Sequence, residues 1–490
     1  MQAQTQTNKT LPLSLQQAVE LAVEHNLDVQ IQRYTPLNDT FLLAEATAAY
    51  EPALNTSVRR QWAYQPSSIS ATGVQNLSTR SDDSTFSAGI GGAGGGLATT
   101  PWGLGYSLST TIDKTTFRRF DENSLPFLFD QGTTFAGITL QQPLLRNFWI
   151  DATRRDILIA RKTIKFDELG FRLQVINIIA QTEQAYYDLV YDVENVKVQQ
   201  EAVELAAEQA REDRKRVEVG SMSPLDEQQT ESQLASSRAA LLAAQQTLGT
   251  QQNVVKSLIS DKFTEIYNVT IVPTDRLVAV PETLDLQESW RTGVKMRPDL
   301  QQAKVDLERR GITLRYSKNQ LFPEVDLTGT YGRRGVEPTV GAALDDIPED
   351  RFPTYSYGIV VSVPLGARSQ RAAYRSARAS IETAQLQYKK AEQIILIAIE
   401  NAVGNINSSM EKIRADREAR EYAEAALQAG RKKLEVGRST TFEVLGLQSK
   451  LTAARTAEIQ SLAEYNKAHS VLTQWEGMTL EKHRLNVKVK

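Results

Sequence analysis

The sequence contains one structural plan twice, and this duplication constrains its fold more than any other feature. The run "RKRVEVGSMSPLDEQQ", which begins at Arg214, recurs as "RKKLEVGRSTTFEVLG", which begins at Arg431. At the same offset, Ala160 matches Ala377, and further matches follow the two runs. Agreement at a fixed distance along a chain is the signature of repeated structural units.

Two further blocks match in the same order in both halves. "LSLQQAVELAVEHNLDVQ" aligns with "LDLQESWRTGVKMRPDLQ", and this register continues to Pro52 and Pro323. "FAGITLQQPL" aligns with "SYGIVVSVPL" at a smaller offset, because the first copy carries more residues between these blocks. We therefore expect a tail at 1–12, a first repeat at 13–264 with an insertion at 65–132, a linker at 265–283, a second repeat at 284–477 and a tail at 478–490.

Each repeat begins with a short helical pattern and then changes to strands. After Pro52 and Pro323, apolar residues alternate with small or polar ones, as in 325–331 and 355–363. Such strands have one apolar face, which needs either a core or closure into a barrel with lipid outside. The second-repeat strands are expected within 323–364. In the first repeat, strand-like segments within 84–112 predict an extra hairpin at a rim or a longer wall.

Aromatic residues lie near the ends of these strands and fit the interfacial girdle of a membrane barrel. They are Trp62, Tyr64, Tyr331, Tyr355 and Tyr357. An ordinary β-sandwich with exposed aromatic residues is the alternative. No apolar run approaches the ~18 residues of a membrane-spanning helix. The first residues lack the blocks of a secretory signal, so an exported protein would have had its signal removed.

Very long helices follow the strands in both repeats. Between Thr153 and Val219 there is no Pro and a single Gly, and apolar residues recur every seven positions. The second repeat shows the same period from Ile399 to Leu434. A sustained heptad predicts a coiled-coil seam, and about 65 helical residues would extend roughly 100 Å. These segments are too long for an ordinary compact domain.

Each long helix ends at a glycine, and a second helix follows. Gly220 and Gly437 suit the left-handed turn that stops a helix, and Pro224 suits a first helical turn. The sequence therefore predicts two antiparallel helical hairpins. Their tips are expected near 220–226 and 437–443.

The sequence contains few of the residues that commonly form catalytic sites. Cys is absent, and His25, His469 and His483 are far apart in sequence, which argues against thiolate sites and a histidine-based centre. The run "GGAGGG" lacks the Gly-Lys-Ser/Thr ending of a phosphate loop. The formal net charge of −3 does not indicate a nucleic-acid partner. We expect no enzyme, no cofactor and no metal site.

The order of short helix, strands and long helical hairpin, repeated once, resembles the TolC-like outer-membrane efflux proteins. "VGSMSPLDEQQTESQL" and "VGRSTTFEVLGLQSKL" are similar to the hairpin tips of that family, and "QQPLL" and "VEVG" also fit. The resemblance spans Leu13 to Gly477. It implies an α+β membrane protein: a homotrimeric twelve-stranded outer-membrane β-barrel, about four strands per chain, continued by a long antiparallel α-helical coiled-coil tunnel through the periplasm.

The resemblance also implies a function and partners. The protein would be a passive duct of a tripartite system in the outer membrane of a Gram-negative-type cell. It would export small molecules or proteins together with a periplasmic adaptor, or membrane fusion protein, and an inner-membrane transporter. A soluble periplasmic coiled-coil scaffold, or the adaptor itself, is the alternative, although an adaptor should have one hairpin and this chain has two.

Residues at the tips take their expected roles from the same resemblance. Glu443 would form an acidic ring that gates and selects at the periplasmic entrance. Asp226 and Arg438 would form a latch between hairpins. Both carboxylates could equally be helix caps, because acidic residues in a first helical turn favour the helix dipole. Adaptor hairpins would dock at the tips, on Gly220, Pro224 and Gly437.

Overall fold

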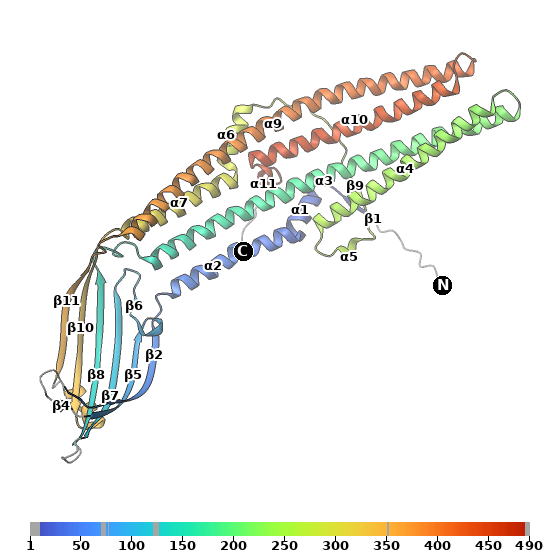
Figure 1. Ribbon diagram of the computed structural model, residues 1–490. Coiled ribbons are helices and arrows are strands. Elements are labelled where there is room, and N and C mark those ends of the chain that lie inside the picture. Colours follow the sequence, from blue (N-terminus) through green and yellow to red (C-terminus); the bar gives the residue numbers. More distant parts are fainter. Residues whose placement is uncertain (1–9, 70–74, 77, 121–126, 350–351, 486–490) are drawn as a thin grey trace, which may run out of the picture. The chain divides into compact units, whose positions relative to one another are not determined.

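The computed structural model describes residues 10–69, 75–76, 78–120, 127–349 and 352–485 (Figure 1). The chain forms two units. The helical unit comprises Met1–Leu37, Lys165–Lys304 and Leu386–Lys490. The sheet unit comprises Asn38–Ile164 and Val305–Gln385.

The helices of the two repeats match in length, pair by pair, as expected of a tandem duplication. The two helices that open each repeat have 11 and 22 residues. In the hairpins, the outgoing helix has 67 or 68 residues and the returning helix has 36. Their bounds are α1 (Leu15–His25) and α6 (Leu286–Met296), α2 (Leu27–Ala48) and α7 (Pro298–Asn319), α3 (Ala152–Glu218) and α9 (Arg368–Glu435), and α4 (Pro224–Ile259) and α10 (Thr441–Glu476).

Short elements fasten the ends of the repeats in the helical unit. Strand β1 (Thr10–Leu13) pairs in parallel with β9 (Thr270–Pro273), and two short helices follow the hairpins, α5 (Phe263–Ile266) and α11 (Thr479–Lys482). The segments expected to be tails and a linker therefore contain ordered elements. This pairing connects residues some 260 positions apart, beyond the reach of any local sequence pattern.

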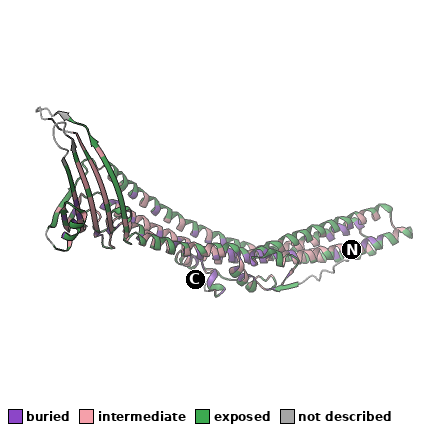
Figure 2. Cartoon of the chain, turned by 90° about the horizontal axis from the view of Figure 1, so that it is seen from below, coloured by how far each residue is buried: buried purple, intermediate pink, exposed green. Residues whose placement is uncertain are grey.

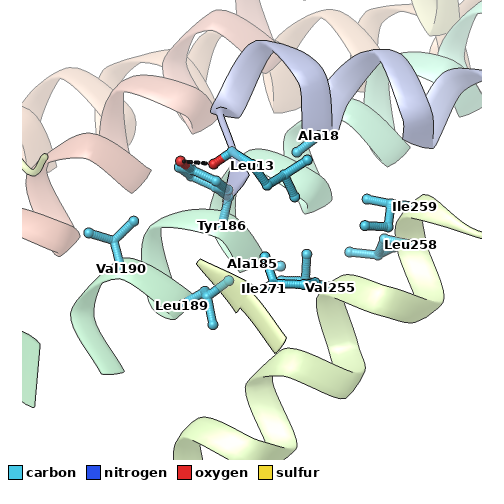
Figure 3. Packing of buried hydrophobic residues seen from close by; sticks show 10 residues of the cluster. All are labelled: Leu13, Ala18, Ala185, Tyr186, Leu189, Val190, Val255, Leu258, Ile259 and Ile271. Carbon is cyan, nitrogen blue, oxygen red and sulfur yellow. Dashed lines mark hydrogen bonds between the residues drawn. The ribbon is translucent and has the colours of Figure 1, made fainter. Parts of the chain in front are cut away.

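Buried residues of the long helices form the core of the helical unit, and Val175 and Leu189 of the seven-residue series are among them. Tyr186 of α3 is fully buried, and its hydroxyl donates to the Leu13 carbonyl at 2.9 Å and approaches Asp275 Oδ2 at 2.8 Å (Figure 3). In the second repeat, Ile399 and Ile406 of the predicted seam are also buried. No helix among the described residues is both long enough and apolar enough to cross a membrane.

The sheet unit contains six long antiparallel strands. Their order across the sheet is β11-β10-β8-β7-β5-β2. The shorter elements are β6, which pairs with β7, the pair β3–β4, the 3-10 turn η1 and helix α8. The bounds are β2 (Ala53–Gln65), β3 (Ser68–Ile69), β4 (Gln75–Asn76), β5 (Ser78–Gly91), η1 (Ala93–Gly95), β6 (Ala98–Thr99), β7 (Gly105–Phe120), β8 (Phe127–Pro143), β10 (Glu324–Glu337), α8 (Val340–Glu349) and β11 (Pro353–Ser362).

The expectation of about four strands per chain requires a correction to six. The additional strands are β5 and β7, which come from the insertion and lie between β2 and β8. There each additional strand has hydrogen-bonding neighbours on both sides, whereas a separate hairpin would leave exposed edges. Of the two predicted placements, the longer wall is therefore the correct one. Helix α8, which connects β10 to β11, was not predicted from the sequence.

The register gives the sheet one apolar and one polar face. We define the apolar row as the cross-strand neighbours Leu54, Ile90, Leu108, Ile138, Tyr331 and Tyr355. The adjacent row points to the other face and contains Asn55, Gly89, Ser109, Gly137, Gly332 and Thr354. Helix α8 packs on the apolar face at Thr134, whose hydroxyl donates to the Ala343 carbonyl. Most other strand residues are exposed or half-buried (Figure 2), so a single chain leaves the rest of this face largely uncovered.

Candidate functional site

Both hairpins turn at a glycine with a left-handed backbone. Gly220 has φ 75° and Gly437 has φ 71°, and their N–H groups donate to carbonyls in the last turn of the preceding helix. The next residues, Ser221 and Arg438, donate from their N–H groups to Arg216 and Lys433, both at 2.8 Å. This pair of bonds is the motif that ends a helix at glycine. The two tips lie at the same end of the helical unit (Figure 1).

Side-chain caps start the return helices immediately after each turn. In the turn of the first hairpin (tip 1), Ser223 Oγ accepts a hydrogen bond from the N–H of Leu225, and Pro224 occupies the first helical turn. In the turn of the second hairpin (tip 2), Thr440 Oγ1 accepts a hydrogen bond from the N–H of Glu443. The Glu443 carboxylate in turn accepts a hydrogen bond from the Ser439 hydroxyl at 2.6 Å. Glu443 is thus part of a cap, while its side chain is exposed at the end of the hairpin.

The expected latch partners do not meet within one chain. Asp226 is half-buried and Arg438 is exposed, and no ion pair joins them among the described residues. A latch between neighbouring subunits stays a prediction, because it would require a second chain.

An ion-pair clamp distinguishes tip 1 from tip 2. Arg214 of α3 contacts Glu227 at 3.3 Å and Glu231 at 2.6 Å on α4, which joins the two arms of the first hairpin. Arg431 is the repeat counterpart of Arg214, but Val444 and Gln448 stand where Glu227 and Glu231 stand in the first repeat. Arg431 has no ion pair in the described part of the chain. The second hairpin therefore lacks this electrostatic restraint near its tip.

A buried polar layer next to tip 1 also lacks a counterpart. Asp213 is fully buried and accepts a hydrogen bond from Gln209 Nε2 at 2.9 Å, while its second carboxyl oxygen has no hydrogen-bond partner among the described residues. Burial raises the pKa of Asp213, and the hydrogen bond from Gln209 only partly offsets this effect. The repeat counterpart of Asp213 in the second hairpin is Gly430, and the Leu447 side chain packs against it.

A groove runs between the return helices of the two hairpins. It has a volume of about 390 Å³, and its lining residues are Gln228, Gln229, Ser232, Gln233, Phe442, Leu445, Gly446 and Ser449. The Phe442 side chain lines this groove and is 70 % exposed. Phe442 was not predicted as a site residue from the sequence. An aromatic residue in the first turn of the return helix, two residues after the N-cap Thr440, was the available signal.

All five aromatic residues predicted for a girdle lie on the apolar face of the sheet. Tyr331 pairs directly with Tyr355, and Tyr357 lies one row nearer the helix-connected strand ends. Trp62 and Tyr64 lie near the opposite end of β2, across from Asp82 and Arg80. The register thus separates the five residues into two groups along the strands. Within the described residues, no cluster of His, Asp and Glu side chains could hold a metal ion.

The fold and the duplicated hairpins agree with a match to a known family. The profile of the outer membrane efflux protein family matches residues 103–260 and 294–477. The chain belongs to this family. It is an outer-membrane efflux channel that extends into the periplasm, and not an enzyme. This assignment decides against the alternatives of a soluble scaffold or an adaptor.

Characterised relatives and solved structures show the same similarity. The chain is 24% identical over 336 residues to the outer membrane efflux protein BepC of Brucella suis, covering 67% of this chain and 69% of BepC. It is 21% identical over 308 residues to the outer membrane protein TolC of Escherichia coli, covering 61% of each chain. The fold matches the outer-membrane channel OprN with a TM-score of 0.69, at 17% identity and coverage of 94% of this chain and 89% of OprN. For the Campylobacter jejuni CmeC channel, the TM-score is 0.67 at 15% identity, with 94% and 85% covered.

Proposed function

We propose that three copies of this chain form one closed export duct, gated at the hairpin tips. The observation that carries this proposal is the open sheet: among the described strands, β2 and β11 each have a neighbour on one side only. Unpaired strand edges are unfavourable in lipid, where backbone polar groups find no water. Pairing β2 of one copy with β11 of the next would satisfy both edges. Three chains of six strands would then close a barrel of eighteen strands, wider than the twelve-stranded expectation.

Glu443 is the proposed entrance residue. It lies exposed beside the second tip, and three-fold symmetry would place three such carboxylates around the axis. A ring of carboxylates in a narrow opening raises the local concentration of cations and repels anions. Its hydrogen bond from Ser439 fixes the carboxylate at the helix start, so capping and gating are compatible roles for one side chain.

Asp226 and Arg438 are the proposed inter-subunit latch. They belong to different hairpins, and neither is engaged by an ion pair within the described chain. A contact between them would hold neighbouring tips together in the closed state. The Arg214 clamp restrains the first hairpin near its tip, whereas the ion pairs described between α9 and α10 lie further from the second tip, so the second tip is the proposed moving part.

The groove between the return helices is the proposed docking place for the periplasmic adaptor. Its polar and small lining residues suit the side of a helix, and Phe442 supplies an apolar anchor. Gly220, Pro224 and Gly437 determine the shape of the turns beside it. The chain offers no nucleotide-binding motif, so energy would come from an inner-membrane transporter. That transporter would also decide whether small molecules or proteins are exported.

The gate is tested by conductance of the full-length protein in a planar bilayer. Glu443→Ala should lower the preference for cations over anions, because three carboxylates leave the entrance. Glu400→Ala is the matched control, since Glu400 is an exposed carboxylate on α9 far from the tip in sequence. Unchanged selectivity in Glu443→Ala, or an equal change in the control, would contradict the gate assignment.

The oligomer and the docking groove need separate measurements. Mass determination in detergent should give three chains, and cysteines introduced on β2 and β11 should cross-link between copies. Phe442→Ser should weaken capture of an adaptor by roughly thirtyfold, since a buried aromatic anchor often contributes ~2 kcal/mol. Tyr422→Ser, which removes an exposed aromatic residue elsewhere on α9, is the control. Equal capture by both variants would remove the groove from the docking surface.

A further inference from the structure

The apolar face of the sheet becomes basic toward the strand ends that lie away from the helix connections. Between the apolar row and those strand ends, the same face has another apolar cross-strand row, formed by Val58, Phe86 and Ile112. The rows beyond it contain cations. On β2, β5 and β7 these rows contain Arg60, Ser84 and Lys114, then Trp62, Asp82 and Thr116, then Tyr64, Arg80 and Arg118.

The four cations of these rows, Arg60, Arg80, Lys114 and Arg118, are all exposed, and we call them the basic patch. Only Arg60 has an ion pair there, with Asp82 at 3.0 Å. Arg80, Lys114 and Arg118 lie within the described strands without an acidic group at ion-pair distance. Within the described strands, one of the four cations of the patch is therefore paired directly, and three remain available to an external anion.

Two contacts make this arrangement unusual. Arg80 and Arg118 are direct cross-strand neighbours, and like charges in that position destabilise a sheet. The Arg80 guanidinium also lies 5.7 Å from the centre of the Trp62 ring, which suits a cation–π contact. An external anion between the two arginines would remove their repulsion. Acidic residues on the same face of the neighbouring strands are Asp82, already bound by Arg60, Asp130 on β8 and Glu337 on β10, and α8 packs on this face at Thr134.

The position of the patch along the strands identifies the kind of anion. Arg60 lies six residues beyond Leu54 of the apolar row, about 20 Å along the strand at ~3.4 Å per residue. At a strand tilt of ~40°, that distance is about 15 Å along the membrane normal. Trp62 and Tyr64, which fit the aromatic girdle at a membrane interface, lie on β2 in the rows of the patch. The patch would therefore lie at the outer lipid boundary, where headgroup phosphates are found.

We propose that the basic patch binds the phosphate groups of an anionic glycolipid in the outer leaflet of the outer membrane. This inference rests on the proposed barrel, in which the apolar face points toward lipid. Arg80 and Arg118 would share one phosphate, because guanidinium groups bind phosphate through paired hydrogen bonds. Lys114 would contribute a second positive charge, and Trp62 and Tyr64 would flank the sugar headgroup at the interface. The bound lipid would hold β5 and β7, the strands supplied by the insertion, within the barrel wall.

The test uses the full-length protein reconstituted in phosphatidylcholine vesicles, with or without bisphosphorylated lipid A. After detergent extraction, native mass spectrometry counts the lipid molecules retained by each oligomer. The double variant Arg80→Gln/Arg118→Gln should retain roughly tenfold less lipid A than the wild type, because charge-assisted bonds are lost. Arg59→Gln is the matched control, since Arg59 adjoins Arg60 in sequence but points to the polar face.

Other outcomes would overturn the inference. Equal retention by the double variant and the wild type would show that the patch does not bind the lipid. Equal retention of dephosphorylated lipid A would show that phosphate is not recognised. Dissociation of the double variant into single chains in lipid-free detergent would make the patch a subunit contact instead. If the wild type conducts as a trimer but retains no lipid A, this inference fails alone; if it forms no conducting trimer, the proposed function fails with it.

Discussion

Replacing Glu183 by Gln should destabilise the helical unit in a pH-dependent way. Glu183 lies on α3 with its side chain fully buried, and it accepts hydrogen bonds from Ser470, Lys482 and His483. The Lys482 and His483 contacts are 3.0 and 2.9 Å long. These three partners come from α10 and from the segment around α11, so one carboxylate joins the C-terminal part of the chain to the first hairpin.

The size of the effect follows from the pKa of this carboxyl. Burial by itself raises the pKa of Glu183, but the hydrogen bond from His483, the charge of Lys482 and the remaining hydrogen bonds outweigh it and hold the pKa at about 2. Compared with the ordinary value of 4.5, this shift corresponds to about 3 kcal/mol. Lys482 is 41% exposed, so water screens part of its contribution. We therefore expect a loss of about 2 kcal/mol in Glu183→Gln at pH 7.

The direction with pH is fixed by linkage. Because the folded-state pKa is depressed, the stabilisation is present above the unfolded value of about 4.5 and is lost as the pH falls toward 2. The wild type and Glu183→Gln should therefore differ at pH 7 and converge as the pH falls from 4.5 toward 2.

Urea unfolding followed by helical circular dichroism in detergent, at pH 7, 4 and 3, measures this difference. Glu194→Gln is the control, since Glu194 forms an exposed pair with Lys197 on the same helix and should change stability by less than about 1 kcal/mol. A difference of equal size at pH 7 and pH 3 would refute the linkage reasoning. No difference at pH 7 would refute the claim that the buried charge stabilises the fold.

Three further perturbations test other contacts of the helical unit. Burial, followed by the charge of Asp188, raises the pKa of Asp192 to about 6. Because the folded-state pKa is raised, the wild type should lose up to about 3 kcal/mol of unfolding free energy as the pH rises from 3.8 through 6. Asp192→Asn should not show this loss. Arg214→Gln should speed amide hydrogen exchange at tip 1 by roughly two- to five-fold, with Arg431→Gln unchanged, and equal effects would argue against the clamp. Gly437→Val should destabilise tip 2 by about 1–2 kcal/mol through its positive φ alone, because a Cβ there meets no atom within 4 Å; unaltered hydrogen exchange at tip 2 would contradict this.

Several parts of the candidate site were predictable because they depend on local chemistry. The glycine turns, the Ser223 and Thr440 caps and Pro224 in the first helical turn follow from backbone preferences of individual residues. The clamp at Arg214 was not predicted, although its partners are visible in the sequence. Its geometry depends on how α3 and α4 are rotated about their axes, and the heptad pattern alone does not fix that rotation to the accuracy of an ion pair.

Taken by itself, the sequence determined the duplication, the two long hairpins and the alternation of apolar and polar residues in the strands. These features have periods of a few residues or a fixed repeat distance, so they survive without knowledge of contacts. Only the tertiary structure decided that β5 and β7 enter the sheet and that β1 pairs with β9. It also aligned Arg80 with Arg118 on the apolar face. Each of these depends on hydrogen-bond register between strands separated along the chain, and a slip of one residue would move every side chain to the opposite face.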